Sequence, residues 1–167
     1  MDIKQLRLLM PQNAQDVEAA RNLVSLGPEV LAPVVPDMVR RLKDHKSPVA
    51  EIYCVFFASH GERFTNIFGD FLGRSTMPDL KNIIVTRIMV HWSRDGVAAL
   101  AGALSMLLTG SDFYDTDLVS IRLLHAHNLA DAKWLAGWLE FKRNRLAQLL
   151  NEADQIASQF SSSPTAP

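Results

Sequence analysis

The sequence predicts an all-α protein. Apolar residues recur three and four positions apart through most of the chain, which is the spacing of one helix face. Pro28, Pro48 and Pro78 stand where these periodic segments begin, and proline is favoured in the first turn of a helix because its missing N–H needs no partner there. Beyond short β-branched runs, the chain lacks the period-two alternation of a strand.

The periodicity predicts eight helical segments, near residues 15–25, 28–43, 49–60, 62–73, 78–91, 95–109, 116–127 and 130–159. Ser47 and Thr76 are expected to cap the helices that follow them. Pro33 and Pro36 are expected to kink the second segment or to split it into a short turn and a longer piece. Residues 49–59 are nearly all apolar, which predicts a helix buried on most sides.

A weak internal repeat organises these segments. Gly27, Gly61 and Gly96 stand 34 and 35 residues apart and each precedes an apolar-periodic segment, while Pro48 and Pro78 open the intervening helices. A helix pair that recurs every 30 to 45 residues is typical of HEAT, armadillo or tetratricopeptide solenoids, and the tetratricopeptide consensus is absent. We therefore predict a short HEAT-like α-solenoid of about eight helices, arranged as stacked antiparallel helix pairs. Chance spacing of three glycines among eight is the alternative.

Length and charge narrow the class further. The 167 residues fit one domain, which we expect over residues 1–160, with a disordered polar tail over 161–167. The 17 basic and 18 acidic side chains give a net charge of −1, so a nucleic-acid partner is not expected. The lone Cys54 excludes an internal disulfide. The charged N-terminus lacks a secretory signal, and the longest uncharged stretch, 96–111, is shorter than a membrane span. We expect a cytoplasmic protein without a membrane partner.

The sequence offers no pattern of catalytic or metal-ligating residues. No two histidines or cysteines stand three or four positions apart, and His125 and His127, two apart, would lie on different helix faces. Cys54 falls in the most apolar stretch, where a thiol behaves as an inert hydrophobe. Phosphate-binding loops, nucleophile elbows and dinucleotide fingerprints are absent. We predict no enzyme, no metal and no cofactor.

The loop over residues 111–117 is the first candidate partner site. It combines three carboxylates with two adjacent aromatic side chains, namely Asp112, Phe113, Tyr114, Asp115 and Asp117. Exposed aromatic residues among acidic groups are typical of a patch that binds a basic protein. The structural alternative is that Asp115 or Thr116 caps the next helix while Phe113 and Tyr114 fill the core.

The last helix carries the second candidate. Trp134 and Trp138 share one face because they stand four positions apart, and exposed tryptophans are enriched at interfaces. A second stripe in near-heptad steps, interrupted by Lys142, is expected to dock the helix on the preceding pair rather than to form a coiled coil. That stripe comprises Leu135, Leu139, Leu146, Leu149, Ala153, Ile156 and Phe160. Two basic clusters are interpreted as solvated faces, namely Arg40, Arg41, Lys43 and Lys46, and Lys142, Arg143 and Arg145.

Residues 8–92 contain four stretches with a shared pattern: LLMP at 8–11, the 28–42 helix with its inner Pro36, SPVA at 47–50, and the Gly61 helix followed by 79–92. In these stretches the chain resembles a bacterial family of small all-α, HEAT-like proteins that is catalogued as a domain of unknown function. Proteins of this kind accompany toxins or secreted effectors as immunity proteins, and this is the function that the resemblance implies.

Two hypotheses remain open. The first is a non-enzymatic protein-binding module, concretely a bacterial immunity protein that neutralises a cognate toxin or effector. The alternative is an enzymatic or small-molecule-binding domain with a pocket between helices. Its candidate residues are His60, Glu62 and Arg63 at a helix junction, with His125 and His127.

Overall fold

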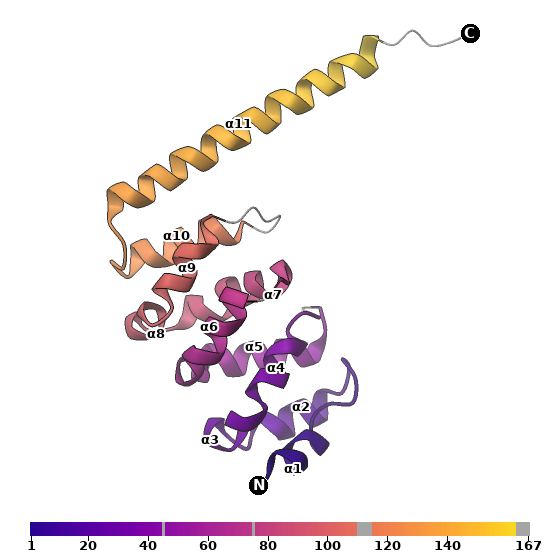
Figure 1. Cartoon of the computed structure of the whole chain (residues 1–167). Helices are drawn as coiled ribbons and strands as arrows, with labels where there is room; N and C mark the ends of the chain where they lie inside the picture. The colour runs from indigo at the N-terminus through magenta and orange to yellow at the C-terminus, as the bar shows by residue number, and fades with distance from the viewer. Residues whose placement is uncertain (45, 75, 110–114, 163–167) are drawn as a thin grey trace, which may run out of the picture. The chain divides into compact units, whose positions relative to one another are not determined.

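The fold is described from a computed structural model that covers residues 1–44, 46–74, 76–109 and 115–162. These ranges contain helices and turns and no strand, which confirms the all-α prediction. The chain divides into two compact units, Met1–Leu129 and Ala130–Pro167, where the sequence predicts a single domain over 1–160. From α1 to α10, the helices of the first unit are placed along it in space in the order in which they occur in the sequence (Figure 1).

The helices of the first unit form two alternating sets that follow a short helix α1 (Ile3–Leu8). The first set comprises α2 (Val17–Val24), α5 (Pro48–His60), α7 (Pro78–Ile83) with its π-helical and 3-10 continuations η3 (Ile84–Ile88) and η4 (Met89–His91), and α10 (Thr116–Ala126). The second set comprises α3 (Pro28–Leu31), η1 (Ala32–Val34) and α4 (Val35–Arg41), then η2 (Gly61–Phe64) and α6 (Thr65–Arg74), then α8 (Arg94–Ala98) and α9 (Ala101–Leu107). Helices of one set contact each other: α2 packs on α5, α5 on η3, η3 on α10, and α6 on α9.

The segments break where backbone geometry requires it. The two prolines split the 28–43 segment into α3, η1 and α4, which confirms one of the two predicted outcomes. The single helix predicted over 95–109 is wrong, because Leu100 has φ −114° and ψ 11° and interrupts the helix between α8 and α9. Leu100 is buried, and the segment contains no proline to mark the break, although Gly102 stands two residues after it. Helix α1 was not predicted, since six residues give too short a periodic pattern.

The predicted caps have different outcomes. The hydroxyl of Ser47 accepts a hydrogen bond from the Ala50 amide at 3.1 Å, so its cap is confirmed. The Thr76 cap is wrong, because Met77 occupies the N-cap position of α7 and its side chain makes no capping bond.

A chain of edge-to-face aromatic rings ties the core together. Phe57 contacts Phe68 at 5.2 Å between ring centroids, and Phe68 contacts Trp92 at 5.3 Å. The indole N–H of Trp92 donates to the Phe57 carbonyl at 3.0 Å. These contacts join α5, α6 and the residue after η4. The predicted burial of the 49–59 segment is confirmed for most of its residues, although Val55 is exposed.

The second unit contains α11 (Ala132–Ser162), a helix of 31 residues. The Asp131 carboxylate caps it by accepting a hydrogen bond from the Trp134 amide at 2.9 Å. The helix extends past the predicted end at 159, and residues 163–167 of the predicted tail lie outside the described residues. None of the helices in the described ranges is long and apolar enough to cross a membrane.

Candidate functional site

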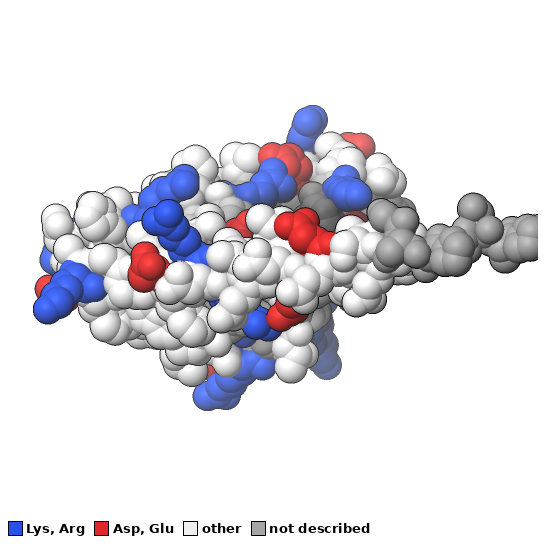
Figure 2. Space-filling model, turned by 90° about the horizontal axis from the view of Figure 1, so that it is seen from above, with Lys and Arg blue, Asp and Glu red and all other residues white. Residues whose placement is uncertain are grey.

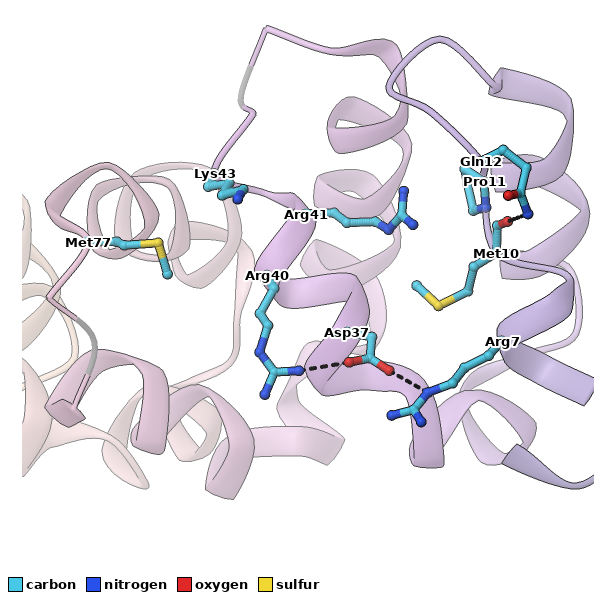
Figure 3. A pocket seen from close by; sticks show the side chains of 9 residues that line it. All are labelled: Arg7, Met10, Pro11, Gln12, Asp37, Arg40, Arg41, Lys43 and Met77. Carbon is cyan, nitrogen blue, oxygen red and sulfur yellow. Dashed lines mark hydrogen bonds and ion pairs between the residues drawn. The ribbon is translucent and has the colours of Figure 1, made fainter. Parts of the chain in front are cut away.

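The first unit carries an open cavity of about 570 Å³ beside α4. Its lining comes from the end of α1 and the residues after it, from α4 and the residues after it, and from the residue before α7. The described residues that line it are Arg7, Met10, Pro11, Gln12, Asp37, Arg40, Arg41, Lys43 and Met77. Figure 3 shows Asp37 between the Arg7 and Arg40 side chains.

Positive charge dominates this cavity. Four of its side chains are cationic and only Asp37 is anionic, so the lining carries a net charge of about +3 at neutral pH. Asp37 accepts from Arg7 Nε at 2.9 Å and from Arg40 Nη1 at 2.7 Å. This carboxylate fixes two guanidinium groups side by side and leaves their other N–H donors available for an anionic group.

Two further cavities continue the first one. A cavity of about 420 Å³ shares Arg40 and Met77 with it and adds Phe71 and Arg74. A third, of about 680 Å³, shares Lys43 and Met77. The first two cavities form one groove, which we call the basic groove and define by Arg7, Arg40, Arg41, Lys43 and Arg74 around the apolar side chains of Met10, Phe71 and Met77. Its acidic side chains are Asp37 and Asp70, so its net charge is about +3. The third cavity adds Asp44 and Asp79 and is not part of the basic groove.

One cation of the basic groove packs directly on its apolar surface. The Arg40 guanidinium lies over the Phe71 ring, 5.9 Å from its centroid, which holds a cation against an apolar surface. Sequence reasoning noted the cluster of Arg40, Arg41 and Lys43 and interpreted it as a solvated face. It missed Arg7 and Arg74, since no local pattern shows that α1 and α6 bring them to α4.

The predicted acidic loop falls largely outside the described residues. Asp112, Phe113 and Tyr114 lie in the range that the structure does not describe, so their role stays a prediction. Asp115 precedes α10 in the left-handed region, with φ 53°, and its side chain makes no capping bond. Asp117 accepts from the Leu118 amide at 2.8 Å. The predicted contact of Asp115 and Asp117 with a partner therefore also stays a prediction.

The predicted tryptophan pair belongs to an aromatic row on α11. The rings of Trp134 and Trp138 are 6.3 Å apart and nearly perpendicular, and Trp138 and Phe141 are 5.7 Å apart. This spacing confirms that the two tryptophans share one side of the helix. A binding role for Trp134 and Trp138 stays a prediction.

The alternative pocket residues have structural partners. Glu62 accepts hydrogen bonds from the backbone amide and the hydroxyl of Ser93, where α8 begins. Arg63 pairs with Glu29, and His60 lies 5.2 Å from the Phe56 ring. A hydrogen bond from its own backbone amide, together with the Arg63 cation, lowers the pKa of Glu29. The Glu62 and Arg63 contacts join neighbouring helices, whereas the His60 contact lies within α5.

Cys54 shows no sign of activation. Its side chain is 3% exposed, and burial raises its pKa to about 11, so the thiol stays protonated at neutral pH. Its small cavity of about 270 Å³ also contains Glu51 and Arg87, which pair with each other. Among the described residues, no three histidine, cysteine or acidic side chains lie close enough to hold a metal ion.

Comparison of the chain with protein-family models, with curated proteins and with solved structures finds no match.

Proposed function

We propose that this chain is a non-enzymatic protein-binding module, built as a short HEAT-like α-solenoid, that binds and neutralises a cognate toxin or effector as a bacterial immunity protein. The observation that carries the binding proposal is the basic groove, an open surface with a net charge of about +3 around an apolar floor.

Long-range hydrogen bonds support the repeat architecture. They join residues 30 to 36 positions apart, which is the length of one helix-pair repeat: Arg7 to Asp37, Arg63 to Glu29, Asn82 to Thr116, Arg87 to Glu51, Trp92 to Phe57, Ser93 to Glu62 and Arg94 to His127. In a solenoid each repeat contacts only its neighbours, so its polar contacts span about one repeat. The contacts of α2 with α5, of α5 with η3 and of η3 with α10 follow the same order.

The shape and charge of the basic groove favour an acidic protein segment as its occupant. Two adjoining cavities make the groove longer than a single small-molecule pocket. Exposed arginines around an apolar floor can pair with carboxylates while Met77 and Phe71 receive apolar side chains. This polarity is the opposite of the basic partner expected for the 111–117 loop.

The identity of the partner as a toxin or effector rests on the family resemblance of residues 8–92. An immunity protein inhibits by covering its partner, which requires a complementary surface and no catalytic group of its own. A positively charged groove would suit a toxin whose active site or substrate entrance is lined with acidic residues, because opposite potentials steer association and select the partner.

The test is capture of the partner from the native host with the tagged full-length chain. A groove variant, Lys43→Glu with Arg74→Glu, is compared with the control Arg21→Glu with Arg122→Glu, which makes the same charge change at exposed positions on α2 and α10. We expect wild type and control to retain one stoichiometric partner and the groove variant to lose it. The captured partner should arrest growth when expressed alone, and co-expression of this chain should restore growth. Equal retention by both variants would contradict the groove assignment.

A small anionic ligand is the second candidate, favoured by the size of the first cavity, about 570 Å³, and its excess of cations. A ligand at one hundred times its Kd stabilises the folded state by about 2.7 kcal/mol. A thermal-shift series with inorganic phosphate, nucleotides and dicarboxylates would show this in wild type and not in the groove variant. No shift with any of them would remove this candidate.

A further inference from the structure

Helix α11 carries an apolar stripe that a lone helix cannot bury. Leu139, Leu146, Leu149 and Ile156 are 44 to 53% exposed and follow one another in steps of seven, three and seven residues. With Lys142 and Ala153 they occupy successive a and d positions of a heptad pattern, the arrangement by which two helices pack knobs into holes. We call these six positions the α11 seam. The space-filling view shows one face of the molecule, where uncharged side chains lie between scattered basic and acidic ones (Figure 2).

The seam is complementary to itself when a second copy runs in the opposite direction. In an antiparallel pair each a position faces a d position, and the numbers of facing residues then have a constant sum. If the two helices are aligned so that Leu146 faces Leu149 of the second copy, this sum is 295. Leu139 then faces Ile156 of the second copy. Lys142 then faces Ala153. Large apolar side chains therefore meet one another in four of the six layers.

The two remaining layers explain the lysine in the seam. Opposite the small Ala153, the aliphatic stem of Lys142 has room to cover the seam while its ammonium group reaches solvent. A parallel pair would instead place Lys142 against its own copy and leave the two Ala153 methyl groups facing across a void. Both parallel layers are unfavourable, the first by charge repulsion and the second by lost packing.

Charges beside the seam select the same direction. Arg145 and Glu152 are exposed and occupy the same flanking heptad position in successive heptads. In the antiparallel pair with Leu146 facing Leu149, Arg145 lies beside Glu152 of the second copy, and the symmetry repeats this pair. In a parallel pair each of these side chains would lie level with its own copy.

We propose that two copies of this chain associate through α11 as an antiparallel helix pair, with the α11 seam as the interface. This proposal does not depend on the basic groove or on the identity of the groove's partner. It differs from the sequence-based expectation that the stripe from Leu135 to Phe160 docks on the preceding helices; within that stripe Leu135 is buried, and the α11 seam begins after it.

The test measures the mass of the full-length chain by light scattering between about 5 and 200 µM, concentrations that bracket a micromolar Kd. We expect a dimer in this range. Arg145→Glu and Glu152→Arg should each weaken self-association at least tenfold, because each creates two like-charge contacts per dimer. An equimolar mixture of the two variants should dimerise, since both contacts then become complementary. The double variant Arg145→Glu with Glu152→Arg should also recover wild-type association.

Two controls isolate the seam from net charge. Lys133→Glu and Glu140→Arg make the same charge changes on α11 away from the flanking positions, and they should leave the dimer intact. A chain that stays monomeric at 200 µM would overturn the proposal. A dimer with equal affinity in Arg145→Glu, Glu152→Arg and both controls would overturn it too, because it would place the interface elsewhere or in a parallel orientation.

Discussion

Gly61 provides a test of how neighbouring helices fit together. A Cβ atom built at this position would lie 2.6 Å from Cζ2 of Trp92 and 3.1 Å from its Cε2. The indole cannot yield easily, because its N–H donates to the Phe57 carbonyl at 3.0 Å and its ring packs edge-to-face on Phe68. Gly61→Ala should therefore push the Trp92 ring from its site and weaken the contact between α5 and η4.

The magnitude follows from three contributions. Overpacking of a rigid buried ring costs about 1 to 3 kcal/mol. Loss or distortion of the Trp92 hydrogen bond adds about 1 kcal/mol. Alanine in a helical conformation, which Gly61 has at φ −66°, returns about 0.5 to 1 kcal/mol. The free energy of unfolding should fall by about 2 kcal/mol.

The assay is urea unfolding of the full chain, followed by circular dichroism at 222 nm. Gly102→Ala is the matched control, because a Cβ at that exposed helical position meets nothing within 4 Å and should raise stability by about 0.5 to 1 kcal/mol. In a Trp92→Phe background, which removes the clashing benzo ring, most of the Gly61→Ala penalty should disappear. Equal effects of Gly61→Ala and Gly102→Ala would refute the reasoning.

Three further predictions concern buried or bridging side chains. Tyr53→Phe should raise the free energy of unfolding, measured by urea titration, by about 1 to 2 kcal/mol. The reason is that the buried Tyr53 hydroxyl has no hydrogen-bond partner among the described residues, and burial raises its pKa to about 12. A loss of stability in this variant would count against the prediction. Glu62→Ala should lower the free energy of unfolding by about 1 to 3 kcal/mol in the same titration, because the Ser93 amide and hydroxyl lose the carboxylate that accepts their hydrogen bonds. An unchanged midpoint would show that these hydrogen bonds contribute nothing to stability. At pH 8, Cys54 in the folded chain should react with iodoacetamide at least about 100-fold more slowly than a free cysteine, because burial raises its pKa from 9.0 to about 11. As pH rises, the Cys54 thiol loses its proton at a lower pH in the unfolded chain than in the folded one, so the free energy of unfolding should fall between pH 9 and about 11. Cys54→Ala should show a smaller fall. Equal pH dependence of the two chains would contradict the assignment to Cys54.

The glycine spacing illustrates what the sequence could and could not predict. Gly27, Gly61 and Gly96 stand at similar intervals, yet each is required for a different reason. Gly27 has φ +84°, a conformation that side chains disfavour, whereas a Cβ at Gly96 would lie 2.7 Å from the Glu62 side chain. The interval was visible in the sequence. The contacts that require glycine come from residues about 30 positions away and were not.

Helix boundaries were predictable where the chain carries a breaker or a cap. Pro33 and Pro36 mark the division of the 28–43 segment, and Ser47 marks the start of α5. The interruption at Leu100, a buried residue, is marked neither by a proline nor by a capping side chain. Local chemistry thus predicts the ends of helices better than breaks imposed by packing.

The candidate site was less accessible to sequence reasoning. The cluster around Arg40 was visible as charge, but whether it forms a convex face or lines a groove depends on α1 and α6. Arg7 reaches Asp37 from 30 residues away, and Arg74 adjoins Arg40 only through the packing of α6. Charge patterns along one helix therefore predict a basic surface and not its concavity.

The most direct measurement of the central claim is calorimetric titration of the purified full-length chain with its captured partner. We predict one-to-one binding that Lys43→Glu with Arg74→Glu weakens at least tenfold, while Arg21→Glu with Arg122→Glu leaves the Kd unchanged. Wild-type affinity in the groove variant would contradict the claim that the basic groove is the surface through which this protein acts.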